Sequence, residues 1–155
     1  VIAVAAGERR LAVAAAHGAH HLVDRLREDV AARVTEIAGG GADVIFDPVG
    51  GEAFEAGLRC IASEGRLVVV GFASGDVGRL SAGVALGKNI DLIGCYWGAY
   101  RADDRVRRAY QELSRWVEAG RLAPHVGASF PLGEAVRALR ALRDREVGGK
   151  IVLTP

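Results

Sequence analysis

Apolar residues are distributed along the chain in two alternating patterns. Short, continuously apolar runs predict strands at residues 1–4, 21–23, 44–46, 66–70 and 90–94. Between them, apolar residues at helical spacing predict helices at residues 8–17, 29–38 and 52–62. Because these strands are apolar throughout rather than alternating, we expect both of their faces to be buried. The pattern therefore predicts an α/β protein with a doubly wound parallel sheet and helices on both sides of it.

The last third of the chain carries longer amphipathic segments. Residues 103–119 and 133–145 place apolar positions on one side and predict two helices. Residues 124–130 are predicted to be extended, and residues 149–153 form the final predicted strand. This part therefore continues the alternation of helix and strand.

The chain opens directly on an apolar strand. Residues 1–4 are Val-Ile-Ala-Val, and the sequence contains no G-x-G-x-x-G phosphate-binding motif. A helix and a second strand follow at once, as in a nucleotide-binding domain entered partway. We therefore expect a Rossmann-like sheet that is incomplete at its N-terminal side, without its first strand and glycine-rich loop.

Composition and charge narrow the classes of partner. Hydrophobic residues make up 50% of the chain and charged residues 25%, which is ordinary for a globular protein. The net charge of +1 argues against a nucleic-acid partner, and the arginines of residues 101–108 are interleaved with Asp103 and Asp104 on a helix face expected to be solvated. No apolar run approaches the ~20 residues that a membrane span needs. Cys60 and Cys95 lie in apolar surroundings, so we expect buried free thiols and a cytoplasmic location.

Three predicted strands end in glycine-rich segments, at residues 48–51, 71–75 and 94–98. In an open parallel sheet, ligands bind beyond the carboxyl ends of the strands, and glycine lets a cofactor approach the backbone closely. One such segment by itself would indicate a tight turn. Three of them at successive strand ends favour a cofactor site.

The end of the first strand bears on the choice of cofactor. NAD-binding domains usually place an acid there to bond the adenine ribose 2′-hydroxyl. In this chain residues 5–7 are Ala-Ala-Gly, followed by Glu8 in the first turn of a helix and then by Arg9 and Arg10. A guanidinium group can pair with a 2′-phosphate, so the pattern favours NADP(H) bound through Arg10, with simply solvated arginines as the alternative.

No catalytic or metal-binding constellation is recognisable in the sequence. His17, His20, His21 and His125 lack metal-ligand spacing with either cysteine, and no serine lies in a nucleophile elbow. We therefore assign no catalytic residue and no metal ligand to this chain.

Six stretches form a specific combination, although each is weak by itself. They are residues 1–4 (Val-Ile-Ala-Val), 16–19 (Ala-His-Gly-Ala), 43–51 (Asp-Val-Ile-Phe-Asp-Pro-Val-Gly-Gly), 65–71 (Gly-Arg-Leu-Val-Val-Val-Gly), 130–135 (Phe-Pro-Leu-Gly-Glu-Ala) and 149–155 (Gly-Lys-Ile-Val-Leu-Thr-Pro). Together they resemble the C-terminal half of the medium-chain dehydrogenase/reductase superfamily, in its zinc-independent quinone oxidoreductase branch. The resemblance implies that residues 1–124 form a partial NADP-binding domain. Residues 125–155 would return to a GroES-like catalytic domain outside the chain.

The same resemblance implies a function for the parent protein. It would be an NADPH-dependent oxidoreductase that passes hydride from the nicotinamide to a small-molecule quinone or enone. The residues expected to contact NADP(H) are Arg10, Val49, Gly50, Val70, Gly71, Phe72, Ala73, Tyr96 and Trp97. Without the phosphate loop, the chain alone is expected to be inactive and to bind NADPH weakly. Two alternatives stay open: a relative of the zinc alcohol dehydrogenases, and a nucleotide-binding or dimerisation module without catalysis.

The strand at residues 90–94 bears on assembly. It follows the last crossover and is expected at the edge of the sheet, where Leu92 and Ile93 are too apolar to face solvent. The resemblance implies that this edge pairs with its copy across a two-fold axis. We therefore expect a homodimer through residues 90–94.

Overall fold

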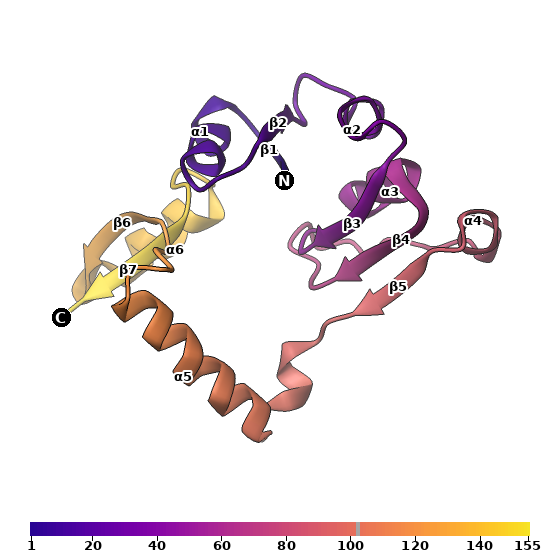
Figure 1. Cartoon of the computed structure of the whole chain (residues 1–155). Coiled ribbons are helices and arrows are strands. Elements are labelled where there is room, and N and C mark those ends of the chain that lie inside the picture. The colour runs from indigo at the N-terminus through magenta and orange to yellow at the C-terminus, as the bar shows by residue number, and fades with distance from the viewer. Residues whose placement is uncertain (102) are drawn as a thin grey trace. The chain divides into compact units, whose positions relative to one another are not determined.

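The computed structural model describes residues 1–101 and 103–155 and divides the chain into two compact units, Val1–Arg101 and Ala102–Pro155 (Figure 1). Helices alternate with parallel strands in both units, so the predicted α/β class is confirmed. The domain boundary predicted after residue 124 concerns a longer parent protein and remains a prediction.

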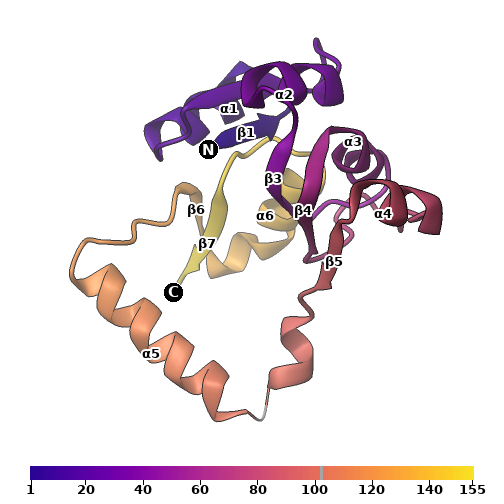
Figure 2. The same cartoon turned by 45° about the vertical axis from the view of Figure 1, so that its right-hand side comes forward.

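The first unit contains two parallel sheets (Figure 2). In one of them β1 (Ile2–Ala5) pairs with β2 (His21–Asp24). In the other, β3 (Ala42–Asp47), β4 (Ile61–Val69) and β5 (Asp91–Gly94) lie side by side in this order. Among the described strands, β5 is therefore at the edge of its sheet, as predicted.

Helices connect these strands. They are α1 (Glu8–Ala16), α2 (Val30–Ala38), α3 (Glu52–Cys60) and α4 (Ala82–Lys88), with the 3-10 helix η1 at Trp97–Tyr100. The bounds of α2 follow local signals, because Asp29 Oδ1 accepts a hydrogen bond from Ala32 N at 2.9 Å and Gly39 closes the helix with a φ of 70°. The helix predicted at 52–62 ends earlier, at Cys60, because Ile61 is extended and already belongs to β4.

The helix α4 is not predicted from the sequence pattern. It is short and contains Gly83 and Gly87, which lower its intrinsic helix propensity. Ser81 Oγ accepts a hydrogen bond from Gly83 N at 3.3 Å, and Asn89 ends the helix in the left-handed conformation. Two caps and contact with β4 therefore stabilise a helix that periodicity alone does not reveal.

Two apolar clusters form the core of the first unit. The first contains Val23, Ala31, Val34 and Cys60, and the second contains Phe54, Leu58, Ile61 and Leu67. Ile45 of β3 packs against both clusters. The first cluster therefore joins β2 to α2 and the end of α3, and the second lies between α3 and β4.

The prediction that both faces of the strands are buried is wrong for the described residues. Ile45 packs into the core, but its neighbours Val44 and Phe46 are 53% and 67% exposed. Leu92 and Ile93 of β5 are exposed as well. Successive side chains of a strand point to opposite faces, and the core clusters of this unit cover only one face of β3. The apolar pattern thus marks a second face that the described residues of the unit leave uncovered.

The second unit contains α5 (Asp104–Glu118), β6 (Val126–Pro131), the 3-10 helix η2 (Leu132–Glu134), α6 (Ala135–Arg143) and β7 (Lys150–Thr154). The strands β6 and β7 pair in parallel, with α6 as the connection between them. The two long helices and the final strand predicted for this part are therefore confirmed, with small shifts at their ends.

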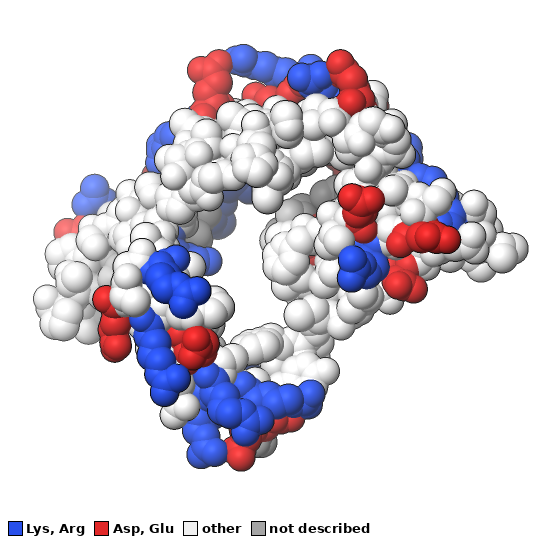
Figure 3. All heavy atoms as spheres, viewed as in Figure 1, with Lys and Arg blue, Asp and Glu red and all other residues white. Residues whose placement is uncertain are grey.

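Charged side chains of both signs gather along α5 (Figure 3). Asp103 caps the helix, and its Oδ1 accepts a hydrogen bond from Arg105 N at 2.7 Å. Arg107 pairs with Asp104 at 2.7 Å, and both side chains are largely exposed. Exposed pairs of this kind contribute little to stability. They confirm that the arginines of this helix form a solvated face.

Candidate functional site

The segments that follow β3 and β4 are tied together at the carboxyl edge of their sheet. Ala73 N donates a hydrogen bond to the Pro48 carbonyl at 3.1 Å. The backbone and the hydroxyl of Ser74 both donate to the Val49 carbonyl, at 2.9 and 2.7 Å. The two loops are therefore hydrogen-bonded to each other and bring together six of the predicted site residues: Val49, Gly50, Val70, Gly71, Phe72 and Ala73.

Asp47, the last residue of β3, organises the first of these loops from within. Its Oδ1 accepts hydrogen bonds from Val49 N at 2.8 Å and from Gly50 N at 3.0 Å. Its Oδ2 is buried and has no hydrogen-bond partner among the described residues. A buried polar atom without a partner is uncommon, so this edge of the sheet retains an unsatisfied acceptor.

The two loops need glycine at position 50 for a packing reason. Gly50 has a φ of 72°, and a Cβ atom there would lie 2.5 Å from the Asp76 carbonyl oxygen and 2.8 Å from the Phe72 ring. At Gly71, a Cβ atom would meet only the Pro48 carbonyl oxygen at 3.4 Å, an ordinary contact. Close approach of the neighbouring loop is therefore sufficient to explain Gly50, before any cofactor is considered.

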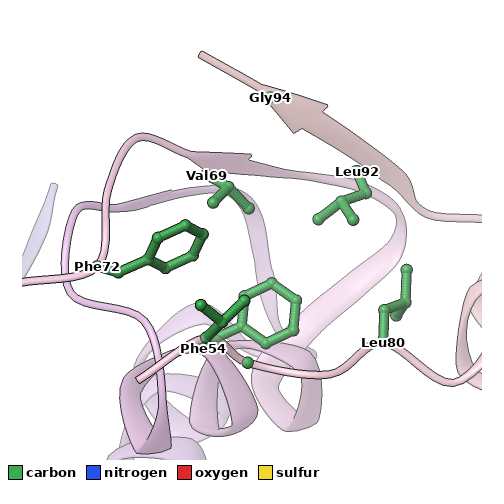
Figure 4. Close-up of a pocket in the computed structure, with 8 residues that line it drawn as sticks. Phe54, Val69, Phe72, Leu80, Leu92 and Gly94 are labelled. Atoms are coloured by element: carbon green, nitrogen blue, oxygen red, sulfur yellow. The ribbon is translucent and has the colours of Figure 1, made fainter. Parts of the chain in front are cut away.

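An open apolar pocket of about 270 Å³ lies next to these loops. Figure 4 shows the Phe72 ring directed toward Phe54 of α3 and Val69 of β4. The pocket is lined by Phe54, Val69, Phe72, Val77, Gly78, Leu80, Leu92 and Gly94. Phe72 is the one predicted site residue in this lining, and its side chain remains nearly half exposed.

Tyr96 and Trp97 continue from the neighbouring strand. Cys95 N donates a hydrogen bond to the Val69 carbonyl at 2.8 Å and so keeps the end of β5 beside β4. Beyond it, the Tyr96 ring lies over Gly98 and is largely exposed, and Trp97 in η1 is about half exposed. Both aromatic residues follow the same edge of the sheet as the fastened loops, without lining the pocket.

Arg10 lies at the end of the other sheet, where β1 turns into α1. Its Nη1 donates a hydrogen bond to the Ala6 carbonyl at 3.2 Å. The turn is held by Asp24, whose Oδ1 accepts from Gly7 N at 3.1 Å and from Leu26 N at 3.0 Å. These two backbone hydrogen bonds, that of Gly7 first, lower the pKa of the Asp24 carboxyl.

Asp24 and Asp47 were not selected as site residues from the sequence, yet each organises a strand end. Both are at least nine-tenths buried, at 7% and 5% exposure. Each is the last residue of an otherwise apolar strand. That position is the signal by which the sequence reveals them, since a strand-end aspartate can accept from the backbone of the turn that follows.

The metal-ligating residue types do not gather in the described part of the chain. Residues 1–101 and 103–155 contain no group of three His, Cys, Asp or Glu side chains able to hold a metal ion. Cys60 and Cys95 are free thiols; Cys60 is buried, and burial raises the pKa of its thiol, whereas Cys95 is only half-buried. Within the same residues, no helix has the length and apolar character needed to cross a bilayer.

A comparison with known proteins shows the family of this chain. A family model described as zinc-binding dehydrogenase matches residues 17–153. The chain belongs to the zinc-binding dehydrogenase family. Its relatives include quinone oxidoreductases of the medium-chain dehydrogenase/reductase superfamily, so the resemblance to that superfamily seen in the sequence is confirmed. The zinc in the family's description has no candidate ligand set among the described residues.

Individual relatives and solved structures match over nearly the whole chain. Quinone oxidoreductase-like protein 2 of Bos taurus is 36% identical over 99% of this chain and 45% of its own length. A mycobacterial protein solved in complex with NADPH has a TM-score of 0.87 at 26% identity, covering 100% of this chain and 48% of that one. An NAD-dependent alcohol dehydrogenase has a TM-score of 0.83 at 32% identity, covering 100% and 43%. The chain thus spans less than half the length of these relatives.

Proposed function

We propose that this chain is the nucleotide-binding portion of an NADP(H)-dependent oxidoreductase that reduces a quinone or an enone. The observation that carries the proposal is the carboxyl edge of the sheet. Hydrogen bonds fasten the loops after β3 and β4 there, while Val49, Phe72 and Trp97 keep apolar surface exposed. Ligands of open parallel sheets bind at this edge.

The described residues fit such a cofactor. The Val49 and Phe72 side chains offer apolar contact, and the unsatisfied Oδ2 of Asp47 is an acceptor at the same edge. Arg10, at the end of β1, supplies a guanidinium group for the adenosine half of the molecule. The bound nicotinamide supplies the hydride. In this proposal the chain's own residues bind and orient the cofactor, and Val70, Gly71, Ala73 and Tyr96 complete the contact surface.

Several relatives support the substrate class. The relative from Bos taurus is named as a quinone oxidoreductase-like protein. A protein of Pseudomonas aeruginosa, which is 31% identical over 100% of this chain and 49% of its own length, is named as a quinone oxidoreductase. Quinones and enones accept a hydride at an electron-poor carbon without needing a protein nucleophile, in keeping with a chain to which we assign none. A direct transfer that does not use zinc and a cytoplasmic location are part of the same proposal.

A second candidate is an NAD-dependent alcohol dehydrogenase, favoured by the 32% identical structure that carries this description. The two candidates differ in cofactor and substrate. Loss of NADPH absorbance with a soluble benzoquinone would be followed in the longest polypeptide that contains this chain. NADPH oxidation that depends on the quinone supports the proposal. Ethanol-dependent reduction of NAD⁺, without quinone reduction, would assign the second function instead.

The isolated chain provides a companion test. It lacks a G-x-G-x-x-G loop, whose helix N-terminus holds the pyrophosphate in Rossmann domains. We therefore expect calorimetric titration of the isolated chain with NADPH to show weak binding. Micromolar affinity would contradict this part of the proposal, because it would mean that the described residues hold the cofactor without that loop.

A further inference from the structure

The open pocket between α3, β4 and β5 has walls of one chemical kind. Eight residues line it, and none of them carries a charged or hydrogen-bonding side chain. Figure 4 shows the Phe54 and Phe72 rings, together with Val69 and Leu92, around the same hollow. A charged group that enters such a pocket loses water and finds no group to replace it, which is costly. The pocket therefore suits an uncharged molecule.

A glycine at the end of β5 keeps this pocket open. Leu92 and Gly94 are two positions apart on the strand, so they face the same side of the sheet, and both line the pocket. A Cβ atom at Gly94 would meet no other atom within 4 Å, and the backbone of Gly94 does not have the left-handed conformation that favours glycine. A larger apolar residue would therefore fit at position 94 and would occupy the hollow.

The two aromatic rings of the pocket are held differently. Phe54 belongs to the buried second core cluster, and its ring lies so close to Gly78 that a Cβ atom there would be 2.3 Å from Phe54 Cδ1. Phe72 comes from the loop after β4, and its side chain is nearly half exposed. The pocket thus combines a ring fixed in the core with a ring that still has surface to offer to a ligand.

The volume of the pocket limits the size of the occupant. An apolar cavity of about 150 Å³ is sufficient for benzene, and this pocket, at about 270 Å³, has room for two fused rings. Contacts between aromatic rings are also more favourable than their buried area alone implies. We propose that the pocket is a binding site for an uncharged, planar aromatic molecule of two fused rings, seated against Phe54, Phe72 and Leu92.

The test titrates the whole chain with 1-naphthol and follows the methyl NMR signals of Val69, Leu80 and Leu92, where we expect saturable shifts. Gly94→Leu should weaken 1-naphthol at least about tenfold, because its side chain takes the space of the ligand. The matched control is Gly133→Leu, which adds the same side chain to an exposed position of η2 where a Cβ atom also meets nothing within 4 Å. This control should leave the affinity unchanged.

A second probe tests the class of ligand. Decahydro-1-naphthol has the same carbon skeleton without aromatic rings, and we expect it to bind about two- to tenfold more weakly than 1-naphthol. Phe72→Ala removes an exposed ring without filling the hollow, and it should weaken 1-naphthol by a similar factor of about two to ten. This variant also provides the test if Gly94→Leu does not fold, as judged by circular dichroism.

Three results would overturn the inference. If 1-naphthol causes no saturable shifts up to its solubility limit, the pocket is not a binding site. If folded Gly94→Leu and Phe72→Ala both bind 1-naphthol as the unaltered chain does, the ligand lies elsewhere. Equal affinity for decahydro-1-naphthol would overturn the aromatic assignment. None of these measurements uses a cofactor, so their failure would leave the proposed function standing.

Discussion

Replacing Lys88 by methionine should loosen the junction of α3, β4 and α4. Lys88 is the last residue of α4, and its Nζ donates to the carbonyl groups of Ile61, Arg59 and Leu58 at 2.8, 3.1 and 3.2 Å. These carbonyl groups lie at the end of α3 and the start of β4, where a helix leaves its last acceptors without intrahelical partners. Methionine keeps an unbranched side chain but removes all three donors.

The magnitude follows from the geometry. One hydrogen bond to a charged group contributes about 1.5–3 kcal/mol. The three bonds share one ammonium group that is only half-buried, so water can replace part of what is lost. We therefore expect Lys88→Met to lower the free energy of unfolding by about 1.5–3 kcal/mol in total, rather than by three times that amount.

Urea unfolding followed by far-ultraviolet circular dichroism would measure this change. The matched control is Arg59→Met, which removes an exposed cation from the last turn of α3 without removing a donor to its carbonyl groups. Only the favourable interaction with the helix dipole is lost there, about 0.3–1 kcal/mol. The reasoning is refuted if Lys88→Met costs no more than the Arg59→Met control.

Four further outcomes are expected. Arg10→Ala should weaken NADPH about tenfold in the cofactor-binding parent protein, since one charge-assisted contact is lost, and leave NADH unchanged; equal losses in competition titrations would remove Arg10 from the site. Gly50→Ala should destabilise the chain by about 2–4 kcal/mol in urea unfolding, because it adds a clash to a left-handed conformation. The control Gly71→Ala should cost under about 1 kcal/mol. Similar costs for the two variants would contradict the close approach of the Asp76 carbonyl to Gly50. The pKa of Asp24 is lower in the folded chain than in the unfolded chain, so its carboxylate stabilises the fold above about pH 4. This stabilisation is lost as pH falls through the folded-state pKa, so Asp24→Asn should flatten the acid side of the profile of stability against pH. An unchanged profile would argue against this role. Leu92→Pro should remove a donor from the edge strand and shift a homodimer toward monomer or aggregate, and light scattering that finds the unaltered chain monomeric would rule out dimerisation through β5.

Much of the fold could be predicted because its signals are local. The helix α2 is marked by Asp29 before it and Gly39 after it, and both act on backbone groups within a few residues. Continuous apolar runs revealed the strands, and their alternation with helices indicated parallel pairing. The convergence of the loops after β3 and β4 follows from the same logic, since parallel strands end at one edge.

The tertiary structure decided what depends on residues far apart in the sequence. Gly50 is needed because the Asp76 carbonyl approaches it from the next loop, and Lys88 matters because α4 brings it to the end of α3. Phe46 looks like a core residue in the sequence but is exposed, because an apolar side chain is buried only where another element covers its face. Sequence patterns thus determined the elements and the edge at which a cofactor is expected, while contacts between distant segments decided which polar groups remain available to bind it.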